Sequence, residues 1–422
     1  MTVTDNAINA IPRFSRSWTD RIRFFDKSVT EVRAVTSADG VEPAGRDTGP
    51  GRAGRDTGAA SDVPAVLVAA MAAAARAGRL AAGEPAGPED AGSDQDGDQG
   101  GDQGVQARKR RIDGQATAAA ESILRGFAER LVIVAGEGPG EQMPGAFVGQ
   151  ELGGDASSPR TWSGIFDYVD GTTLTALGLP GALSLGGLGE GLRSVPDLQA
   201  YAVLAPVSIA GRLDLGTPPE EHALDLIDAI GAECGVRRRG DLRVVTHSHD
   251  TGPFHQTLIR RLREGGVGDV VVPDPVIIEP PYVLARAGLV EPRVDTMIGV
   301  FGFPELMFAC LILELIAPQF TFVFRPASLS GLRGESSTLA PLFDFEDDEV
   351  EQLAAVGLRP HEQFVGSHLV PAGTGRAAAM FSVTGSPLLR LDPPERHGDS
   401  VAVAGLLLER GRTTRLRITS DL

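Results

Sequence analysis

The sequence predicts an α/β or α+β protein in two lobes. From Arg108 onward, short apolar segments of strand length alternate with amphipathic segments of helical spacing, which is the pattern of a layered α/β domain. The chain has 422 residues, of which 42% are hydrophobic, so it can bury a sizeable core in two or three domains. Glycine (53) and proline (29) are abundant while aromatic residues make up only 5%, and we therefore expect part of the chain to remain unpacked.

Two low-complexity segments interrupt this pattern. Residues 1–61 contain Arg-Asp-Thr-Gly twice in a glycine-rich stretch, and residues 83–107 are acidic and end in Asp-Gln-Gly repeats. Between them, Asp62–Leu80 is alanine-rich and helical in spacing, with Asp62 as a candidate N-cap. We expect a flexible segment over 1–61, an N-terminal lobe over 62–200 with a disordered insert at 83–107, and a C-terminal lobe over 201–422.

The remaining elements follow from apolar periodicity and turn residues. An amphipathic helix is expected over Asp113–Leu131. The expected strands are 131–135, 163–166, 200–206, 242–246, 270–272, 295–300, 380–384, 401–409 and 413–418. The expected helices are one that opens at Gly171 and those over 219–233, 254–264 and 304–315. Gly411 joins the last two strands as a hairpin.

Charge and cysteine content exclude several classes of protein. With 56 acidic and 39 basic side chains the net charge is −17, which argues against a nucleic-acid-binding surface and suits carboxylates gathered around divalent cations. Cys234 and Cys310 lie too far apart for a zinc spacing and are expected to be free thiols. The N-terminus lacks the apolar core of a signal peptide, and Leu306–Leu313 is too short to span a bilayer. We expect a cytoplasmic protein that binds neither membrane nor nucleic acid.

The most specific motif is Asp167-Tyr168-Val169-Asp170-Gly171-Thr172, which follows an apolar strand. Two carboxylates at this spacing can bind one or two divalent metals through oxygen. Gly171 allows close backbone approach, and Thr172 opens a helix whose free N–H groups would hold a phosphate. Taken alone, the segment is explained equally well as a β-turn with an aspartate N-cap.

Other carboxylates follow strands or begin helices. Glu137 stands between two glycines after a strand, with Glu141 four residues later, and Asp113 begins a helix. Glu305 leads an apolar helix, where an unpaired buried carboxylate is costly. The structural alternatives are a solvated turn at Glu137, an N-cap at Asp113 and compensation of the helix dipole at Glu305. The functional alternative is metal ligation.

In this order the segments resemble the class II, GlpX-type fructose-1,6-bisphosphatases. These belong to the lithium-sensitive phosphatase superfamily, which includes the inositol monophosphatases. The shared series is Asp-Gly, Gly-Glu-Gly, Asp-x-x-(Glu/Asp)-Gly-Thr and Gly-x-Pro-Glu, within about residues 62–422 outside the insert. The resemblance implies a layered α/β/α/β fold with two sheets and helices between them. It also implies a metal-dependent phosphatase acting on a sugar or polyol phosphate, and a homo-oligomer.

Residue roles are implied by the same resemblance. The metal-ligand positions, for Mg²⁺ or Mn²⁺, are Asp113, Glu137, Asp167, Asp170 and Glu305. Thr172 would orient the attacking water, and Asp113 and Glu141 are further catalytic candidates. The substrate-binding candidates are Lys109, Asp170, Gly171, Thr172, Gln199, Tyr201, His249, His255, Asp274 and Gly302.

The substrate-reading segments depart from the family pattern. The family's Lys-Pro-Arg-His segment is Gly252-Pro253-Phe254-His255 here, so both cations are lost. Its Asp-Gly-Asp loop is Asp274-Pro275-Val276, without the second acid. Losing charge-assisted contacts weakens phosphate binding. Fructose-1,6-bisphosphatase activity is the family default. The lost cations favour two alternatives: a phosphatase or phospho-lyase on another sugar or cyclitol monophosphate, and a non-catalytic scaffold.

Overall fold

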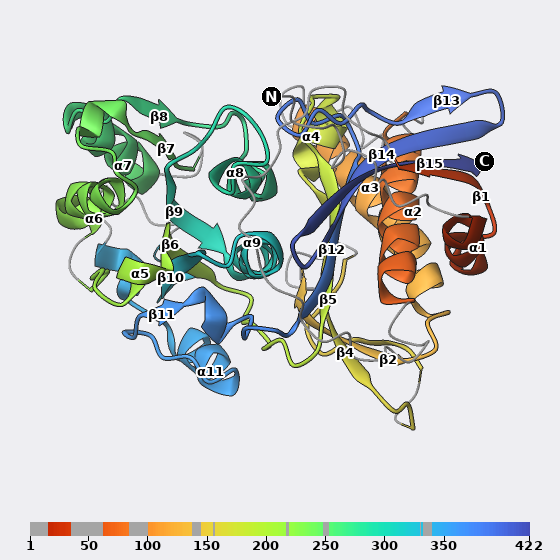
Figure 1. Cartoon of the computed structure of the whole chain (residues 1–422), viewed down its shortest axis with the longest axis horizontal. Helices are drawn as coiled ribbons and strands as arrows, with labels where there is room; N and C mark the ends of the chain where they lie inside the picture. Colours follow the sequence, from red (N-terminus) through yellow and green to blue (C-terminus); the bar gives the residue numbers. More distant parts are fainter. Residues whose placement is uncertain are drawn as a thin grey trace, which may run out of the picture.

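The computed structural model describes residues 16–34, 62–83, 100–136, 145–154, 157–216, 219–247, 253–329, 331 and 340–422. It forms two lobes, each built on one mixed β-sheet, with helices on the outer faces and between the sheets (Figure 1). This confirms the predicted α/β class.

The larger sheet has nine strands. Its order is β1-β15-β14-β12-β5-β4-β2-β3, with β13 pairing to β14, and only the β2–β4 pair is parallel. The strands are β1 (Val29–Ala34), β2 (Arg130–Gly136), β3 (Glu151–Gly153), β4 (Thr161–Asp170), β5 (Leu183–Gly189), β12 (Gly375–Ser382), β13 (Glu395–His397), β14 (Ser400–Glu409) and β15 (Arg412–Asp421). The predicted hairpin at Gly411 is confirmed, because Glu409 pairs with Arg412 across it.

The smaller sheet has six strands in the order β11-β10-β6-β9-β7-β8. They are β6 (Gln199–Pro206), β7 (Arg243–Val245), β8 (Asp269–Val271), β9 (Thr296–Gly302), β10 (Phe320–Ala327) and β11 (Phe364–Val365). Strands β8, β7 and β9 run parallel, so their C-terminal ends meet at one edge, where β9 leads directly into a helix.

Ten α-helices lie within the described ranges. They are α1 (Arg16–Phe25), α2 (Val63–Gly83), α3 (Gly100–Leu124), α4 (Thr172–Leu177), α5 (Val207–Ala210), α6 (Pro219–Glu233), α7 (Pro253–Glu264), α8 (Glu279–Arg286), α9 (Phe303–Ile316) and α11 (Asp347–Ala355). In Figure 1, α8 and α9 lie between the sheets, α2 and α3 cover the far face of the larger sheet, and α6 and α7 cover that of the smaller sheet. The layering expected from the family resemblance is thus present, with one further helical layer.

Helix α2 is long and apolar enough to cross a membrane by length and composition, but most of it is buried inside the fold. It packs on α3 and on β5, whose glycines permit the close approach: a Cβ at Gly186 would come within 2.6 Å of Met71 Sδ on α2. On the other face of the same strand, a Cβ at Gly187 would collide with Leu311 of α9. We therefore interpret α2 as a core helix.

Two segments that were expected to be unpacked form regular elements in the structure. Residues 16–34 form α1 and β1, because Ile22, Val29 and Val32 supply a buried face, although this segment was expected to be flexible. Helix α3 begins at Gly100, inside the expected disordered insert, and therefore contains Asp113 within it and not at its start.

The order of the chain does not follow the order of the lobes. Strands β12 to β15 come last in the sequence yet complete the larger sheet beside β5 and β1. The boundary expected at residue 201 therefore separates the two sheets only for the middle of the chain.

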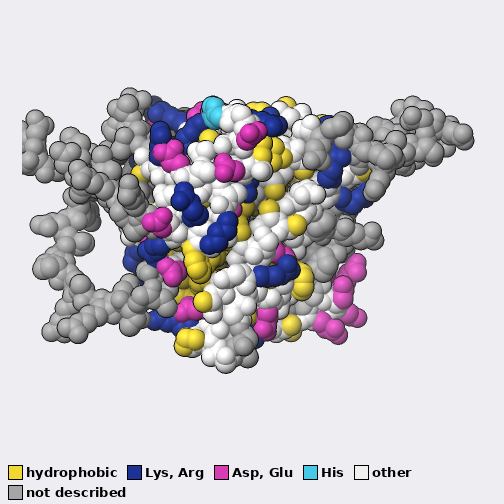
Figure 2. All heavy atoms as spheres, turned by 90° about the vertical axis from the view of Figure 1, so that its right-hand side faces the viewer, with side chains coloured by type: hydrophobic (Ala, Val, Ile, Leu, Met, Phe, Trp, Pro, Cys, Tyr) yellow, Lys and Arg dark blue, Asp and Glu magenta, His cyan; other side chains and the backbone are white. Residues whose placement is uncertain are grey.

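On the outer face of the larger lobe, acidic and basic side chains are interspersed over the described residues (Figure 2).

Candidate active site

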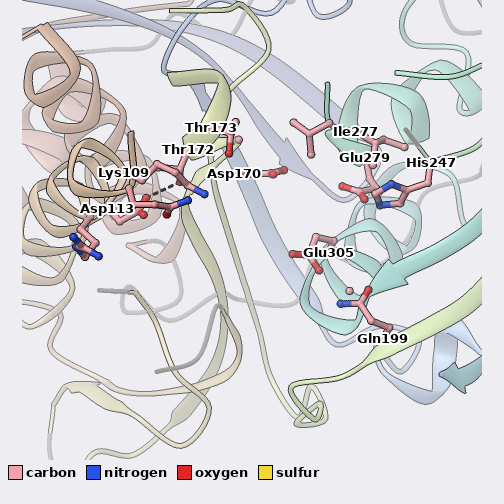
Figure 3. Close-up of a pocket in the computed structure, with 15 residues that line it drawn as sticks. Lys109, Asp113, Asp170, Thr172, Thr173, Gln199, His247, Ile277, Glu279 and Glu305 are labelled. Carbon is pink, nitrogen blue, oxygen red and sulfur yellow. Dashed lines mark hydrogen bonds between the residues drawn. The ribbon is translucent and has the colours of Figure 1, made fainter. Parts of the chain in front are cut away.

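A pocket of about 360 Å³ contains side chains from both lobes (Figure 3). It is bounded by α3, the β4–α4 turn, the first residue of β6, the end of β7 and the N-termini of α8 and α9. The lining residues are Gln106, Lys109, Arg110, Asp113, Asp170, Gly171, Thr172, Thr173, Gln199, His247, Val276, Ile277, Glu279, Gly302 and Glu305. A volume of this size accommodates a small metabolite.

On one wall, Thr172 and Asp113 form a buried pair. The Thr172 hydroxyl donates to Asp113 Oδ1 at 2.7 Å and lies 2.9 Å from the carbonyl oxygen of Val169, so these two acceptors share its single hydrogen. Asp113 is 5% exposed. Burial raises the pKa of Asp113 to about 6, while the Thr172 hydrogen bond and the charge of Lys109 act in the opposite direction.

The β4–α4 turn brings Asp170 and Thr172 to the pocket. Gly171 has φ 87° and precedes α4, and a Cβ there would come within 3.0 Å of Ile278 Cδ1. A glycine is therefore required at this position. The β4–β5 register shifts between Asp167 and Asp170, as in a β-bulge, which changes the direction of the strand just before the turn.

On the opposite wall, two glutamates begin neighbouring helices. Glu279 is the first residue of α8 and Glu305 the third of α9, and Figure 3 shows their carboxylates close together. Burial, together with the charge of Glu305, raises the pKa of Glu279 to about 8, and burial also raises the pKa of Glu305. Within the described part of the chain, Glu305 Oε2 is buried without a hydrogen-bond partner. A Cβ at Gly302 would collide with this oxygen, so glycine is needed for the carboxylate to fold back over the strand end.

His247 lies beside these glutamates. Its ring stacks on His255 with 4.6 Å between centroids, and burial lowers the pKa of His247 to about 4, so it is neutral at pH 7. Behind it, His255 is 1% exposed, and its Nε2 accepts a hydrogen bond from the Val300 amide at 3.5 Å.

The sequence of residues 103–421 matches the family described as bacterial fructose-1,6-bisphosphatase, glpX-encoded. The chain belongs to this family. It is 23% identical over 300 residues to a D-fructose 1,6-bisphosphatase class 2/sedoheptulose 1,7-bisphosphatase of Trichormus variabilis, covering 68% of this chain and 81% of the relative. It is 24% identical over 258 residues to the fructose-1,6-bisphosphatase class 2 of Haemophilus influenzae, covering 60% and 71%.

This member of the GlpX-type family brings most of its described candidate residues together. Those that line the pocket are Lys109, Asp113, Asp170, Gly171, Thr172, Gln199, Gly302 and Glu305. Three other candidates, Glu137, Glu141 and His249, lie outside the described residues.

Four candidates do not line the pocket. The Asp167 carboxylate accepts a hydrogen bond from the Val169 amide at 3.0 Å, next to the pocket wall. Tyr201 is fully buried in the core around the smaller sheet. His255 lies behind His247, and Asp274 is exposed beside a neighbouring cavity.

Glu279 is the main residue that the sequence reasoning missed. It follows Ile277-Ile278 and precedes two prolines, both of which stand in the first turn of α8. The same combination of apolar residues, proline and glutamate at a helix start occurs in Phe303-Pro304-Glu305. That repetition was the available signal.

The donor chemistry of the pocket fits a hard divalent cation. Among the described residues, no three His, Cys, Asp or Glu side chains are close enough to form a complete metal site. Nevertheless, Asp113, Asp170, Glu279 and Glu305 all present carboxylates to the same cavity, and the unpartnered Glu305 oxygen is what a cation would satisfy. Oxygen ligands of this kind suit Mg²⁺ or Mn²⁺.

Proposed function

We propose that this GlpX-family protein is a metal-dependent phosphatase that hydrolyses a sugar phosphate. The observation that carries the proposal is the buried Thr172–Asp113 pair facing Glu305 across one pocket. Family membership supports a phosphatase acting on sugar phosphates. The resemblance further supports a homo-oligomer.

The metal ligands in this proposal are Asp113, Asp170 and Glu305, with Glu137 and Asp167 assigned by the family resemblance. When bound, Mg²⁺ or Mn²⁺ would neutralise phosphate charge and lower the pKa of a coordinated water. The clustered carboxylates of the pocket are costly without such a cation, because each buried negative charge raises the pKa of its neighbours. This cost argues against a non-catalytic scaffold.

The chain's own residues supply orientation and proton handling. Because the Thr172 hydroxyl donates to Asp113, its lone pairs remain available to accept a hydrogen from a water and aim that water at phosphorus. Asp113, which accepts the hydrogen of the Thr172 hydroxyl, can take up the proton that the water loses through that hydroxyl. Lys109 and Arg110 provide positive charge for the phosphate on the same wall.

Phosphate release from a panel of sugar and inositol phosphates, with Mg²⁺ or Mn²⁺, tests this proposal. Asp170→Asn should lower turnover by at least about 100-fold, because it removes a carboxylate from the reacting centre. Asp392→Asn, at an exposed position, is the matched control and should behave as wild type. If a folded, metal-supplied sample released no phosphate from any member of the panel, the phosphatase proposal would be refuted.

A further inference from the structure

Positive charge in the pocket is confined to one wall. Of the described residues that line the pocket, only Lys109 and Arg110 are lysine or arginine, and both come from α3. The opposite wall carries Gln199, His247, Val276, Ile277, Glu279 and Glu305. Of the segments outside the described residues, 137–144 and 248–252 contain no lysine or arginine, whereas 332–339 contains Arg333.

This wall is chemically unsuited to a phosphate. A phosphate ester dianion offers only acceptor oxygens and needs N–H donors or cations to replace its water. Among the described residues of this wall, no guanidinium or ammonium group is available to a second dianion. Hydroxyl groups, in contrast, donate to carboxylates and both donate to and accept from a glutamine amide.

Building on the proposed phosphatase function, we propose that the preferred substrate carries a single phosphate. The phosphate lies on the α3–α4 wall with Lys109, and the other end of the molecule is an uncharged, hydroxylated carbon chain held by Gln199, His247 and Glu279. Glu279 and Gln199 are then specificity-determining residues. The number of phosphates on the preferred substrate would then distinguish this chain from relatives named as bisphosphatases, whose substrates carry a phosphate at each end.

Gln199 is a suitable position at which to introduce a cationic side chain on this wall. It is the first residue of β6, it pairs with Gly302, and its side chain enters the pocket beside Glu305 (Figure 3). An arginine at this position would place a guanidinium, the geometry best suited to phosphate, on the wall that lacks one. A methionine of similar length adds no charge and serves as the matched control.

The experiment compares kcat/KM for fructose 1-phosphate and fructose 1,6-bisphosphate, which differ only in the second phosphate. With Mg²⁺, the wild-type protein should favour the monophosphate by at least about tenfold. Gln199→Arg should raise the bisphosphate-to-monophosphate ratio of kcat/KM by about tenfold or more, while Gln199→Met should leave that ratio unchanged. An equal or greater kcat/KM of the wild-type protein for the bisphosphate would overturn the inference, as would the same ratio in both variants.

Binding separates this inference from the phosphatase proposal. Calorimetric titration of the Thr172→Val variant with each sugar measures affinity without turnover. If the variant binds the monophosphate about tenfold more tightly than the bisphosphate, the inference is supported. This holds even if the wild-type protein hydrolyses neither ester, because that second result would refute only the phosphatase proposal. Hydrolysis of both sugars with tighter binding of the bisphosphate would refute the inference alone. Binding of neither sugar would also overturn it.

Discussion

Replacing Thr172 by valine tests the central pair of the pocket. Valine has nearly the same shape as threonine but lacks the hydroxyl that donates to Asp113 Oδ1 at 2.7 Å. Because Asp113 is 5% exposed, water has little access to replace the lost donor. The substitution should therefore leave a buried carboxylate without this hydrogen bond, and a water in the site without its orienting hydroxyl.

The size of the effect follows from the charge state of Asp113. A hydrogen bond to a charged group contributes about 1.5–3 kcal/mol, so Thr172→Val should lower the free energy of unfolding by about 2 kcal/mol at pH 8, where Asp113 is ionised. At pH 5, below its pKa of about 6, Asp113 is mostly protonated and the loss should shrink to about 1 kcal/mol. Turnover should fall by about 10² to 10⁴, the usual contribution of a positioned proton-transfer group.

Urea denaturation at both pH values, with metal chelated, measures the first effect, and phosphate release with Mg²⁺ measures the second. Thr172→Ser keeps the hydroxyl and should retain most of the turnover, at a cost of about 1 kcal/mol for the lost methyl group. Wild-type stability at pH 8 together with wild-type turnover in the valine variant would show that the pair has neither role.

Three further predictions concern the opposite wall. Mn²⁺ at about 100 times its Kd should stabilise the wild-type protein by about 2.7 kcal/mol, and a thermal shift as large in Glu305→Gln would exclude Glu305 as a ligand. Gly302→Ala should abolish turnover while circular dichroism stays native, because the new Cβ would displace the Glu305 carboxylate; normal turnover would contradict this. Since burial lowers the pKa of His247 to about 4, the unfolded state binds the proton first, and stability should decline by up to about 3 kcal/mol as the pH falls from 6.5 to 4. In urea denaturation at several pH values, His247→Gln should remove that decline. An unchanged pH dependence of the free energy of unfolding would contradict the role of His247.

Local features of the site were predictable because they depend on neighbouring residues in the chain. The strand, Gly171 and the helix at Thr172 form within a few residues, and the chain geometry alone directs Asp170 and Thr172 to one place. The same holds for Glu305, whose position follows from a strand that leads directly into α9.

Features that depend on tertiary packing were not predictable. Helix α3 extends upstream of Asp113, where Ile112 is buried and Val105 packs against the hydrophobic core. This packing depends on the contact between α3 and α2, so it cannot be known before α2 is placed. Tyr201 lies on the same face of β6 as Gln199. It is two residues further along the strand, a distance of about 6.6 Å, and this places it in the core and not at the pocket edge. Glu279 reaches the pocket only because α8 packs beside α9.

The return of the last strands to the larger sheet has a consequence for biosynthesis. Strand β5 pairs with β12, and β1 pairs with β15, so β1 and one edge of β5 have no strand partner until residues 375–421 have left the ribosome. Strand β4, which carries the Asp170–Thr172 turn, stays in an incomplete sheet for the same period. Pairing across nearly the whole chain is slow, and open strand edges favour aggregation. Fragments that end before β12 should therefore be insoluble, and the larger sheet should be completed only after β15 has been synthesised.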